Sequence, residues 1–552
     1  MEFDAVLIPG RRERHVQEGH WRDETINDAL DAAVRSRPDQ TALTAYRLES
    51  GEVTRFTYSE LARMADRVAV GLHHLGIRQR DMVSCQLPNW WQFTVLYLAC
   101  ARIGAVLNPV MPIFRERELK FMLSHAETKL MVVPSTFKSF DHAGMLQQLR
   151  GDLPQLEHLL VIGGQGEQSF EDKLTKPAWE ATPEAAQILS ASRPSADDVT
   201  QLMYTSGTTG EPKGVMHTAN TVSANIWPYA ERLHLGADDV VLMASPMAHQ
   251  TGFMYGLLMP IMLGARVVLQ DVWDANKAVQ VIRDEGVTFT MASTPFLADL
   301  TRVVGESGQG IPSFKTFLCA GAPIPGPLVE QAQKTLGAKI ISAWGMTENG
   351  AVTLIRLEDS DERAVNTDGL PLPGVEIKVV DFDGNTLPAG QIGQLWLRAC
   401  SNFGGYLKRP HLNGTTDDGW FDTGDQARID EQGYLRITGR SKDVIIRGGE
   451  NIPVLEVETL LYKHPAVAQA AVVGYADERL GERACAFVVT KPGQTLDFDA
   501  MVAHFKQHQL TTQYIPERLE VLTAMPSTPS GKIQKFRLRD QLKAMLQERM
   551  AS

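Results

Sequence analysis

The sequence has few of the features that mark disulfide-bonded or zinc-binding proteins. Its five cysteines, at positions 85, 100, 319, 400 and 485, are scattered, and no two of them form a CxxC pair. This spacing indicates neither a zinc site nor a disulfide framework. Cys100 in "YLAC" and Cys319 in "FLCAG" stand in apolar runs, and we therefore expect them to be buried thiols.

Long hydrophobic segments are also missing. The longest uncharged apolar stretch, residues 253–265, is too short to span a bilayer and is interrupted by Pro260. The first twenty residues carry several Arg, Glu and His side chains around no apolar core, so no secretory signal is visible. We expect a soluble, cytoplasmic protein with no membrane span.

Positive charge is not in excess either. The 552 residues carry a formal net charge of -12, which argues against a broad, non-specific binder of nucleic acid or anionic membranes. A recognisable Ser-His-Asp or Cys-His signature of nucleophilic catalysis is also absent. We expect no nucleic-acid partner, whereas the sequence leaves a homo-oligomer open.

What the first 340 residues do contain is a series of short apolar runs separated by helix-sized segments. This alternation predicts parallel sheets covered by helices. The runs are "MVSCQL" (82–87), "LMVVP" (130–134), "HLLVIG" (158–163), "VVLMAS" (240–245), "RVVLQ" (266–270), "FTMAS" (289–293), "TFLCAG" (316–321) and "KIISAWG" (339–345).

From about residue 350 to 438, short strand-like pieces separated by Gly, Asp, Asn and Pro turns replace this pattern. They predict a small antiparallel or barrel-like subdomain. After the charged junction "GRSKD" (439–443) a βα pattern resumes. The predicted fold class is α/β. A large N-terminal domain (1–438) has parallel, helix-covered sheets plus the barrel-like subdomain, and a hinge (439–443) leads to a small, mobile α+β C-terminal domain (444–552).

The stretch "YTSGTTGEPKG" (204–214) combines glycines, hydroxyls and a lysine, as phosphate-binding loops do. A Walker loop requires G-x-x-x-x-G-K-[ST], but here Lys213 follows a proline and precedes a glycine. The two glycines inside the stretch free the backbone to turn N–H groups inward. Composition alone leaves two interpretations open, a phosphate loop and a surface turn rich in Ser, Thr and Gly.

The order of the residues in this stretch resembles the signature loop of the adenylate-forming superfamily, which contains acyl-CoA synthetases, nonribosomal adenylation domains and beetle luciferases. Four further motifs follow in the family's order. They are "SAWGMTE" (342–348), "GWFDTGD" (419–425), "GRSKDVIIRGGENI" (439–452) and "PSTPSGKIQK" (526–535). The whole chain resembles bacterial short- and medium-chain acyl-CoA synthetases and cyclohexanecarboxylate–CoA ligases, through "LPNWWQFTVLYLACARIGAV" (87–106) and "ADERLGERACAFVV" (476–489).

The resemblance implies a nucleotide site that takes ATP with Mg²⁺. Glu348 would hold the metal and Thr347 would contact the α-phosphate, although a Glu at this point also suits a helix start. Trp344 would stack on adenine or, alternatively, fill the core. The expected nucleotide-binding residues are Thr205, Ser206, Gly207, Thr208, Thr209, Gly210, Lys213, Gly321, Ala322, Pro323, Trp344, Gly345, Met346, Thr347, Asp425, Ile437 and Arg440.

Two of these residues are expected at the ribose. Asp425 would accept hydrogen bonds from both ribose hydroxyls, and Arg440 would reach the same sugar. The alternative for Asp425 is an Asx-turn after Thr423 and Gly424.

Lys532 would neutralise the charge that develops during attack on the α-phosphate, whereas Lys535 is expected to be solvated. Gly448 and Gly449 would line the passage for coenzyme A, and Lys442 would lie at the hinge. The resemblance thus implies two arrangements of the C-terminal domain, one presenting Lys532 and one presenting the glycine pair. A further hypothesis is that acetylation of Lys532 silences the enzyme.

The implied reaction joins a small-molecule carboxylic acid to coenzyme A through an acyl-AMP. Amino-acid-activating relatives carry an aspartate in the segment that corresponds to "SPMAHQTGFMYGLLMP" (245–260), which has no acidic residue here. Met and aromatic residues there suit an alicyclic or medium-chain acid. The expected acyl pocket contains His249, Phe253, Met254, Tyr255, Thr294, Pro295 and Trp344.

Three alternatives stay open. They are a CoA-independent acyl-AMP ligase, a standalone amino-acid adenylation enzyme and a non-enzymatic nucleotide-binding protein. The glycine pair opposes the first, the absent aspartate opposes the second, and the presence of Lys213, Glu348, Asp425 and Lys532 opposes the third.

Overall fold

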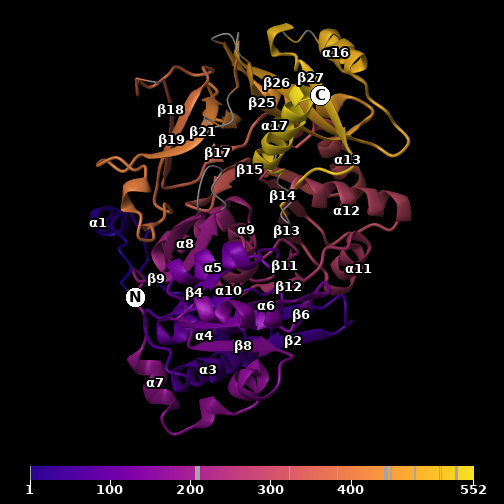
Figure 1. Cartoon of the computed structure of the whole chain (residues 1–552). Helices are drawn as coiled ribbons and strands as arrows, with labels where there is room; N and C mark the ends of the chain where they lie inside the picture. The colour runs from indigo at the N-terminus through magenta and orange to yellow at the C-terminus, as the bar shows by residue number, and fades with distance from the viewer. Residues whose placement is uncertain are drawn as a thin grey trace.

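The computed structural model describes residues 2–205, 212–321, 324–381, 383–440, 445–447, 450–477, 480–508, 510, 512–528 and 533–551. These residues form a mixed α/β structure whose main sheets have nine, seven, four and five strands. In Figure 1 the indigo and magenta elements fill the lower part of the molecule. The orange strands β18, β19 and β21 and the yellow C-terminal elements lie above them.

The nine-stranded sheet is parallel in its centre and antiparallel at both edges. Its order is β17-β16-β15-β14-β13-β11-β12-β1-β2, and the neighbours from β15 to β1 are parallel. The strands are β1 (Thr41–Tyr46), β2 (Val53–Thr57), β11 (Val240–Met243), β12 (Arg266–Gln270), β13 (Phe289–Ala292), β14 (Thr316–Ala320), β15 (Lys339–Met346), β16 (Gly350–Leu354) and β17 (Leu370–Pro371). Because β11, β13, β14 and β15 run in one direction, the residues that follow them lie along one edge of the sheet.

Local sequence signals set the limits of the helices that cross between these strands. The Asp274 side chain accepts a hydrogen bond of 2.9 Å from the Lys277 N–H at the start of α11 (Ala275–Glu285). Gly286 follows that helix with a φ of +67°, a conformation that costs glycine little. The next two crossover helices are α12 (Thr294–Ser307) and α13 (Gly326–Leu336), and both have a proline in the first turn.

The seven-stranded sheet has the order β20-β10-β9-β4-β3-β5-β8. Its strands are β3 (Met82–Cys85), β4 (Val106–Pro109), β5 (Leu130–Pro134), β8 (His158–Ile162), β9 (Val199–Thr205), β10 (Lys213–Thr218) and β20 (Gly405–Tyr406). Helix α4 (Trp91–Ile103) is buried almost all round. It belongs to a core cluster that also contains Val83 of this sheet and Val267 of the nine-stranded sheet, so it packs between the two sheets.

The remaining helices of this part of the chain are α1 (Pro9–Gln17), α2 (Ile26–Ser36), α3 (Tyr58–His74), α5 (Glu116–His125), α6 (His142–Leu149), α7 (Ala185–Ala191), α8 (Ala219–Arg232), α9 (Gln250–Phe253), α10 (Met259–Leu263) and α14 (Asp361–Asn366). A π-helical turn, η5 (Met254–Leu258), joins α9 to α10. The apolar stretch 253–265 therefore lies in one continuous helical run with a π-helical turn, and this run ends at Leu263. Within the described residues, no helix has the length and apolar character needed to cross a membrane.

The antiparallel sheet begins later than the change of pattern in the sequence at about residue 350. It contains β18 (Val375–Val380), β19 (Gly393–Ala399), β21 (Phe421–Ile429) and β22 (Leu435–Arg440). Strands β16 and β17 instead extend the nine-stranded sheet, because β16 folds back antiparallel on β15 and β17 pairs with β16.

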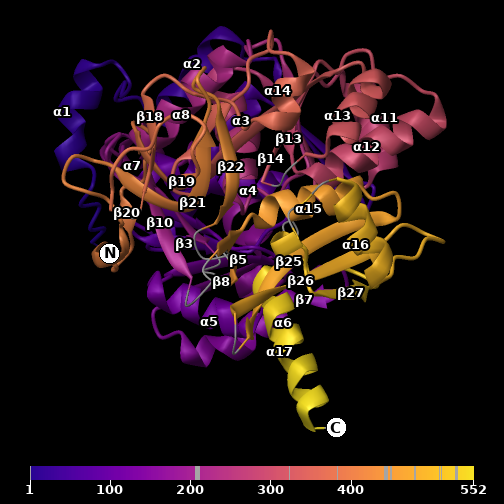
Figure 2. The same ribbon diagram turned by 90° about the horizontal axis from the view of Figure 1, so that it is seen from above.

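The C-terminal residues form the five-stranded sheet and its helices, which have their own small core. Its strands are β23 (Ile445–Arg447), β24 (Glu450–Ile452), β25 (Val467–Asp477), β26 (Gly481–Thr490) and β27 (Arg518–Leu522), and its helices are α15 (Val454–Lys463), α16 (Phe498–Gln507) and α17 (Lys535–Ala551). Figure 2 shows α17 extending away from the other elements. At the start of α17, Lys535 Nζ lies 2.7 Å from Glu458 Oε1. The expectation that Lys535 is solvated was wrong, because this buried carboxylate pairs with it.

The α/β class and the helix-covered parallel sheets predicted from the apolar runs are confirmed, and each run contains a strand. The five cysteines are free and buried, as expected for Cys100 and Cys319.

Candidate functional site

The two ends of the glycine-rich loop lie side by side. Strand β9 ends at Thr205 and β10 begins at Lys213, and these two residues are paired across the antiparallel ladder. The Thr205 hydroxyl donates a hydrogen bond of 3.4 Å to the Lys213 carbonyl oxygen. The loop residues Ser206, Gly207, Thr208, Thr209 and Gly210 lie outside the described residues. The structure thus places the lysine at the base of the loop.

A buried tyrosine connects this lysine to the carboxylate expected to bind metal. Lys213 Nζ donates to the Tyr406 hydroxyl oxygen at 2.8 Å, and that hydroxyl donates to Glu348 Oε1 at 2.7 Å. Lys213 Nζ also lies 4.0 Å from the centre of the Tyr406 ring. Lys213 and Glu348, far apart in the sequence, therefore meet at one phenol. Sequence reasoning missed Tyr406, and the only local signal was the Gly-Gly-Tyr order at 404–406.

The turn that carries Thr347 and Glu348 is fixed on several sides. Glu348 is only 4% exposed, and its carbonyl oxygen accepts a hydrogen bond of 2.7 Å from the Phe403 N–H. The turn joins β15 to β16, and a Cβ atom at Gly345 would collide with the carbonyl oxygen of Gly350. Only glycine permits this approach of the two strands. Met346 and Thr347 are half-buried at the same turn.

His217, a second residue that sequence reasoning missed, supports this turn from β10. Its Nε2–H donates to the Thr347 carbonyl oxygen at 2.8 Å, and its Nδ1 lies 3.0 Å from the Thr221 hydroxyl. Burial lowers the pKa of His217 to about 4, against an ordinary value of 6.5. The imidazole is therefore neutral at physiological pH, and its role in this arrangement is that of a fixed donor.

On the antiparallel sheet, Asp425 lies opposite Arg440 in the β21–β22 ladder. The carboxylate is only 5% exposed, and Oδ2 accepts a hydrogen bond of 2.9 Å from the indole Nε1–H of Trp344. Trp344 is itself buried in the core cluster of this sheet. The two residues predicted for adenine and ribose thus contact each other directly.

Ile437 and Arg440 both lie on β22. The Ile437 N–H donates to Asp368 Oδ2 at 2.8 Å. Burial raises the pKa of Asp368 above its ordinary value, although Arg436 and the Ile437 N–H oppose the rise.

Two of the predicted acyl-pocket residues follow the carboxyl ends of parallel strands: His249 follows β11 and Thr294 follows β13. Gly321, a predicted nucleotide-binding residue, follows the neighbouring strand β14. Phe253 and Met254 are fully buried, and the Phe253 ring meets Tyr97 edge-on at a centroid distance of 4.9 Å. The His249 Nδ1 accepts a hydrogen bond of 3.3 Å from the Thr251 N–H, which is the arrangement of a helix cap.

A buried polar network joins this segment to the turn of Glu348. The Tyr255 hydroxyl donates to Asn225 Oδ1 at 2.6 Å and accepts from the Ala351 N–H at 2.7 Å. Asn225 Nδ2 in turn donates to the Ala351 carbonyl oxygen at 2.8 Å. Because Ala351 follows Glu348 by three positions, the acyl segment and the turn share one hydrogen-bonded support.

The remaining predicted residues, Ala322, Pro323, Lys442, Gly448, Gly449 and Lys532, lie outside the described residues. In the part of the chain that the structure describes, no group of three or more His, Cys, Asp or Glu side chains could hold a metal ion. The Glu348 carboxylate contacts the Tyr406 hydroxyl, which also accepts from Lys213.

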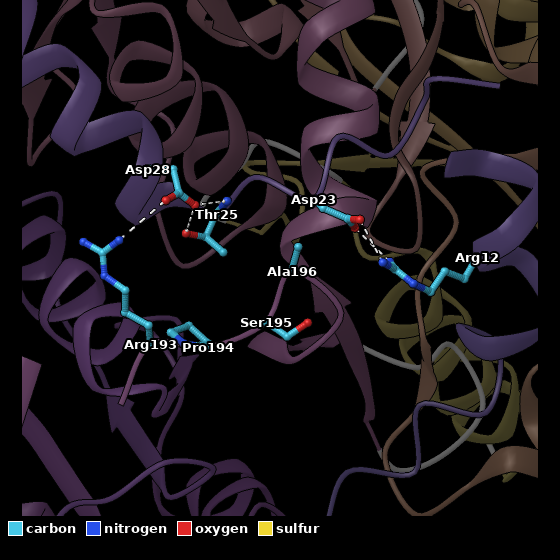
Figure 3. A pocket seen from close by; sticks show the side chains of 8 residues that line it. All are labelled: Arg12, Asp23, Thr25, Asp28, Arg193, Pro194, Ser195 and Ala196. Carbon is cyan, nitrogen blue, oxygen red and sulfur yellow. Dashed lines mark hydrogen bonds and ion pairs between the residues drawn. The ribbon is translucent and has the colours of Figure 1, made fainter. Parts of the chain in front are cut away.

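A cavity of about 340 Å³ lies elsewhere, between the N-terminal segment and the residues that precede β9. Figure 3 shows Arg12 and Arg193 at two sides of it, each facing an aspartate. Arg12 donates to both carboxylate oxygens of Asp23 at 2.8 Å, and Arg193 Nη1 lies 3.7 Å from Asp28 Oδ1. These charges neutralise one another, and none of the predicted nucleotide or acyl residues lines the cavity.

Comparison with known proteins identifies the family of the chain. The sequence matches the family of AMP-binding enzymes over residues 30–407 and the C-terminal domain of AMP-binding enzymes over residues 456–532. The medium-chain fatty-acid–CoA ligase of Escherichia coli (strain K12) is 36% identical over 542 residues, which cover 98% of this chain and 94% of the ligase. A salicylyl-CoA synthase / salicylate adenylyltransferase from Streptomyces sp is 34% identical over 96% of this chain and 95% of that protein.

Among solved structures, the anthranilate CoA ligase AuaEII in complex with anthranoyl-AMP superposes with a TM-score of 0.83. It is 27% identical, and the match covers 95% of this chain and 98% of that chain. These similarities confirm the family resemblance that the motifs indicated. The chain therefore belongs to the AMP-binding enzyme family and is an AMP-forming acid–thiol ligase.

Proposed function

We propose that this protein is an ATP-dependent carboxylic acid–CoA ligase that acts in two steps. In the first, a carboxylate oxygen of the acid attacks the α-phosphorus of ATP, and pyrophosphate leaves. In the second, the thiol of coenzyme A attacks the acyl carbonyl, and AMP leaves. The observation that carries the proposal is the contact of Lys213 and Glu348 through Tyr406, because it brings a cation and a carboxylate together at the base of the glycine-rich loop.

The residues present suit Mg²⁺ bound together with ATP. Mg²⁺ takes one or two carboxylates and otherwise uses phosphate oxygens and water, so the buried carboxylate of Glu348 suits it. When bound, the ion would neutralise phosphate charge and so favour departure of pyrophosphate. Lys213 would orient the leaving phosphates, and the half-buried Thr347 would contact the α-phosphate.

Asp425 is proposed to bind the ribose hydroxyls. The Trp344 indole supports this role, because it donates to Asp425 Oδ2 at 2.9 Å and so orients the carboxylate. Arg440, paired with Asp425 across the ladder, is proposed at the same sugar. Trp344, Gly345 and Met346 would border the adenine, together with Gly321.

The second step is proposed to use the C-terminal part of the chain. The division into domains 1–438 and 444–552, the hinge at Lys442 and the coenzyme A passage at Gly448 and Gly449 remain proposals. Lys532 would serve the adenylation step from the same domain, and its acetylation would remove the charge that this step needs.

An alicyclic or medium-chain aliphatic acid is the proposed substrate class. The support is an apolar segment with Phe253 and Met254, which contains no acidic residue to hold a substrate ammonium. The E. coli relative is named for medium-chain fatty acids, whereas the Streptomyces relative is named for salicylate. Cyclohexane-, benzene- and straight-chain carboxylates therefore belong in one screen.

The screen measures acid-dependent release of AMP and pyrophosphate, with and without coenzyme A, together with thioester formation. We expect thioester from an alicyclic or medium-chain acid, and AMP release that depends on coenzyme A. Pyrophosphate release without any thioester would indicate a CoA-independent acyl-AMP ligase. Pyrophosphate exchange with an amino acid alone would contradict the proposed substrate class.

A further inference from the structure

Tyr406 lies on a segment that ties the two halves of the candidate site together. It belongs to β20, a two-residue strand that pairs with β10, the strand that begins at Lys213. On one side of it, the Leu407 N–H donates to the Gly214 carbonyl oxygen at 2.8 Å. On the other side, the Phe403 N–H donates to the Glu348 carbonyl oxygen at 2.7 Å. The segment therefore fixes the Tyr406 backbone relative to both partners of its hydroxyl.

The Tyr406 side chain is held in place as firmly as its backbone. It is 2% exposed, and its ring packs on Phe403 at a centroid distance of 4.7 Å. The Tyr406 N–H donates to Asn413 Oδ1 at 2.9 Å. Gly405 precedes it with a φ of +129°, a conformation that residues other than glycine rarely adopt. The phenol is thus a rigid group and not a mobile lid.

The Tyr406 hydroxyl occupies the position between a cation and an anion. Its oxygen accepts from Lys213 Nζ at 2.8 Å, and its proton goes to Glu348 Oε1 at 2.7 Å. Hydrogen bonds to charged groups are stronger than those between neutral groups. Burial, and then the neighbouring Glu348, raise the pKa of Tyr406 far above its ordinary value. The phenol therefore bridges the two charged groups by one accepted and one donated hydrogen bond.

We propose that Tyr406 is a positioning residue that prevents Lys213 and Glu348 from closing into a direct ion pair, so that each group stays available for its own part of Mg-ATP. This inference rests on the proposed function, because that function assigns Lys213 to phosphate and Glu348 to the metal. A direct pair in this buried place would gain strength from the low dielectric. Nucleotide binding would then have to break that pair before it could use either group.

The first test removes the hydroxyl and keeps the ring. Tyr406→Phe retains the packing on Phe403 but allows the ammonium and the carboxylate to meet. With EDTA present, so that metal does not contribute, calorimetry is expected to show about tenfold weaker ATP binding, the loss typical of one charge-assisted hydrogen bond. An affinity within twofold of wild type would overturn the proposal.

Tyr434→Phe is a matched control from the same chain. The Tyr434 hydroxyl also bonds a cation and an anion, because it accepts from Arg356 Nη2 at 3.0 Å and donates to Asp359 Oδ1 at 2.7 Å. These two partners already form a direct ion pair at 3.0 Å, so the hydroxyl does not separate them. Tyr434 is buried to a similar degree and packs in a different core cluster. Loss of the Tyr434 hydroxyl is expected to change the stability of the protein but to leave its affinity for ATP within twofold of wild type.

The second test separates positioning from a general structural role. In a Glu348→Gln background no direct ion pair is available, so adding Tyr406→Phe is expected to change ATP affinity by less than twofold. An equal loss in both backgrounds would show that the hydroxyl acts only by supporting the fold, and would overturn the proposal.

A third measurement does not depend on nucleotide at all. Competitive labelling of the nucleotide-free protein with trace acetic anhydride, read by peptide mass spectrometry, reports the reactivity of the Lys213 amine. A direct ion pair favours the charged amine, which does not react. Tyr406→Phe is therefore expected to lower the labelling of Lys213 at least threefold at pH 8. Adding Glu348→Gln to Tyr406→Phe is expected to restore this labelling. Unchanged labelling in Tyr406→Phe would overturn the spacer role.

Wild-type protein that binds no ATP even with Mg²⁺ would refute the proposed function, and the labelling would still decide the role of Tyr406.

Discussion

Trp344 donates a hydrogen bond of 2.9 Å from its indole Nε1 to Asp425 Oδ2, across 81 positions of the sequence. Both side chains are buried, with 9% and 5% of their surface exposed. The contact fixes one carboxylate oxygen of Asp425. Because the carboxylate is planar, the same bond also sets the direction of its other oxygen. The residues proposed to bind adenine and ribose are thus joined by a direct hydrogen bond.

Trp344→Phe is expected to raise the KM for ATP about tenfold, while kcat changes less than threefold. The substitution removes a charge-assisted hydrogen bond and lets Asp425 turn away from the position proposed for ribose binding. Steady-state kinetics with saturating acid and coenzyme A measures the two constants separately.

Trp273→Phe is the control for this experiment. Its indole donates to Asp299 Oδ2 at 3.0 Å, so the same type of bond is lost at another place. The KM for ATP is expected to stay within twofold of wild type. A similar rise of KM in both variants would contradict the role given to the Trp344–Asp425 contact.

His217→Gln tests a pH dependence that follows from burial. The pKa of His217 is about 4 in the folded protein and 6.5 in its ordinary state. Protonation therefore favours the unfolded chain. The stability contributed by the neutral imidazole is fully present above pH 6.5 and is lost as the pH falls from 6.5 towards 4, by about 3 kcal/mol at most.

Urea unfolding at pH 7.5 and pH 5 measures this effect. The free energy of unfolding of His217→Gln is expected to fall less between the two pH values than that of wild type. His142→Asn is a matched control, because burial also lowers the pKa of His142 to about 4. His142→Asn should reduce the pH dependence of stability in the same way but leave the KM for ATP unchanged. His217→Gln should raise the KM for ATP, because His217 supports Thr347. An identical pH dependence in wild type and His217→Gln would contradict the burial argument.

Tyr255→Phe is expected to destabilise the protein by about 1–3 kcal/mol, because the Ala351 N–H and Asn225 Oδ1 would each lose a buried partner. Since Ala351 follows the turn of Glu348, we also expect lower kcat/KM for the acid. Thermal unfolding and steady-state kinetics are the measurements.

Tyr229→Phe is the control for this experiment. Tyr229 stacks on Tyr255 at 4.3 Å, but among the bonds described its hydroxyl contacts only the weakly accepting sulfur of Met291. An equal loss of stability in both variants would contradict this account.

Lys532→Ala is expected to separate the two half-reactions. Acyl-AMP formation should fall by about a hundred- to a thousand-fold, the usual cost of removing a preorganised charge. Thioester formation from supplied acyl-AMP should remain. Lys535→Ala is the control, since Lys535 pairs with Glu458 and its loss should lower the unfolding temperature while both half-reactions persist. Equal loss of both steps in Lys532→Ala would refute the two proposed arrangements of the C-terminal domain.

Much of the fold was predictable because the parallel strands are buried on both faces. Runs such as 130–134 and 266–270 are continuously apolar, and the structure places a strand in each. The start of the antiparallel sheet was not predictable to the same degree. Turn residues around 346–369 mark the change from helix-separated apolar runs to short strand-like pieces. Only strand pairing decides that β16 and β17 belong to the nine-stranded sheet.

The candidate site shows the same division. Motif order identified Lys213, Glu348 and Asp425 by type and spacing. It did not identify Tyr406 or His217, because the Gly-Gly-Tyr order at 404–406 is a weak local signal and a histidine in a strand has no chemical signature of its own. Their positions become informative only when β20 pairs with β10, and β10 carries His217 towards the carbonyl of Thr347.

The amino-acid sequence by itself determined the class of this protein: its α/β layers, its family and the residue types that the family's chemistry needs. Those properties depend on composition, periodicity and short motifs, which act over a few neighbouring residues. The tertiary structure alone decided which groups touch. A lysine at 213, a carboxylate at 348 and a phenol at 406 have no relation along the chain, and they meet because the strands and turns that carry them pack and hydrogen-bond together across the sheets.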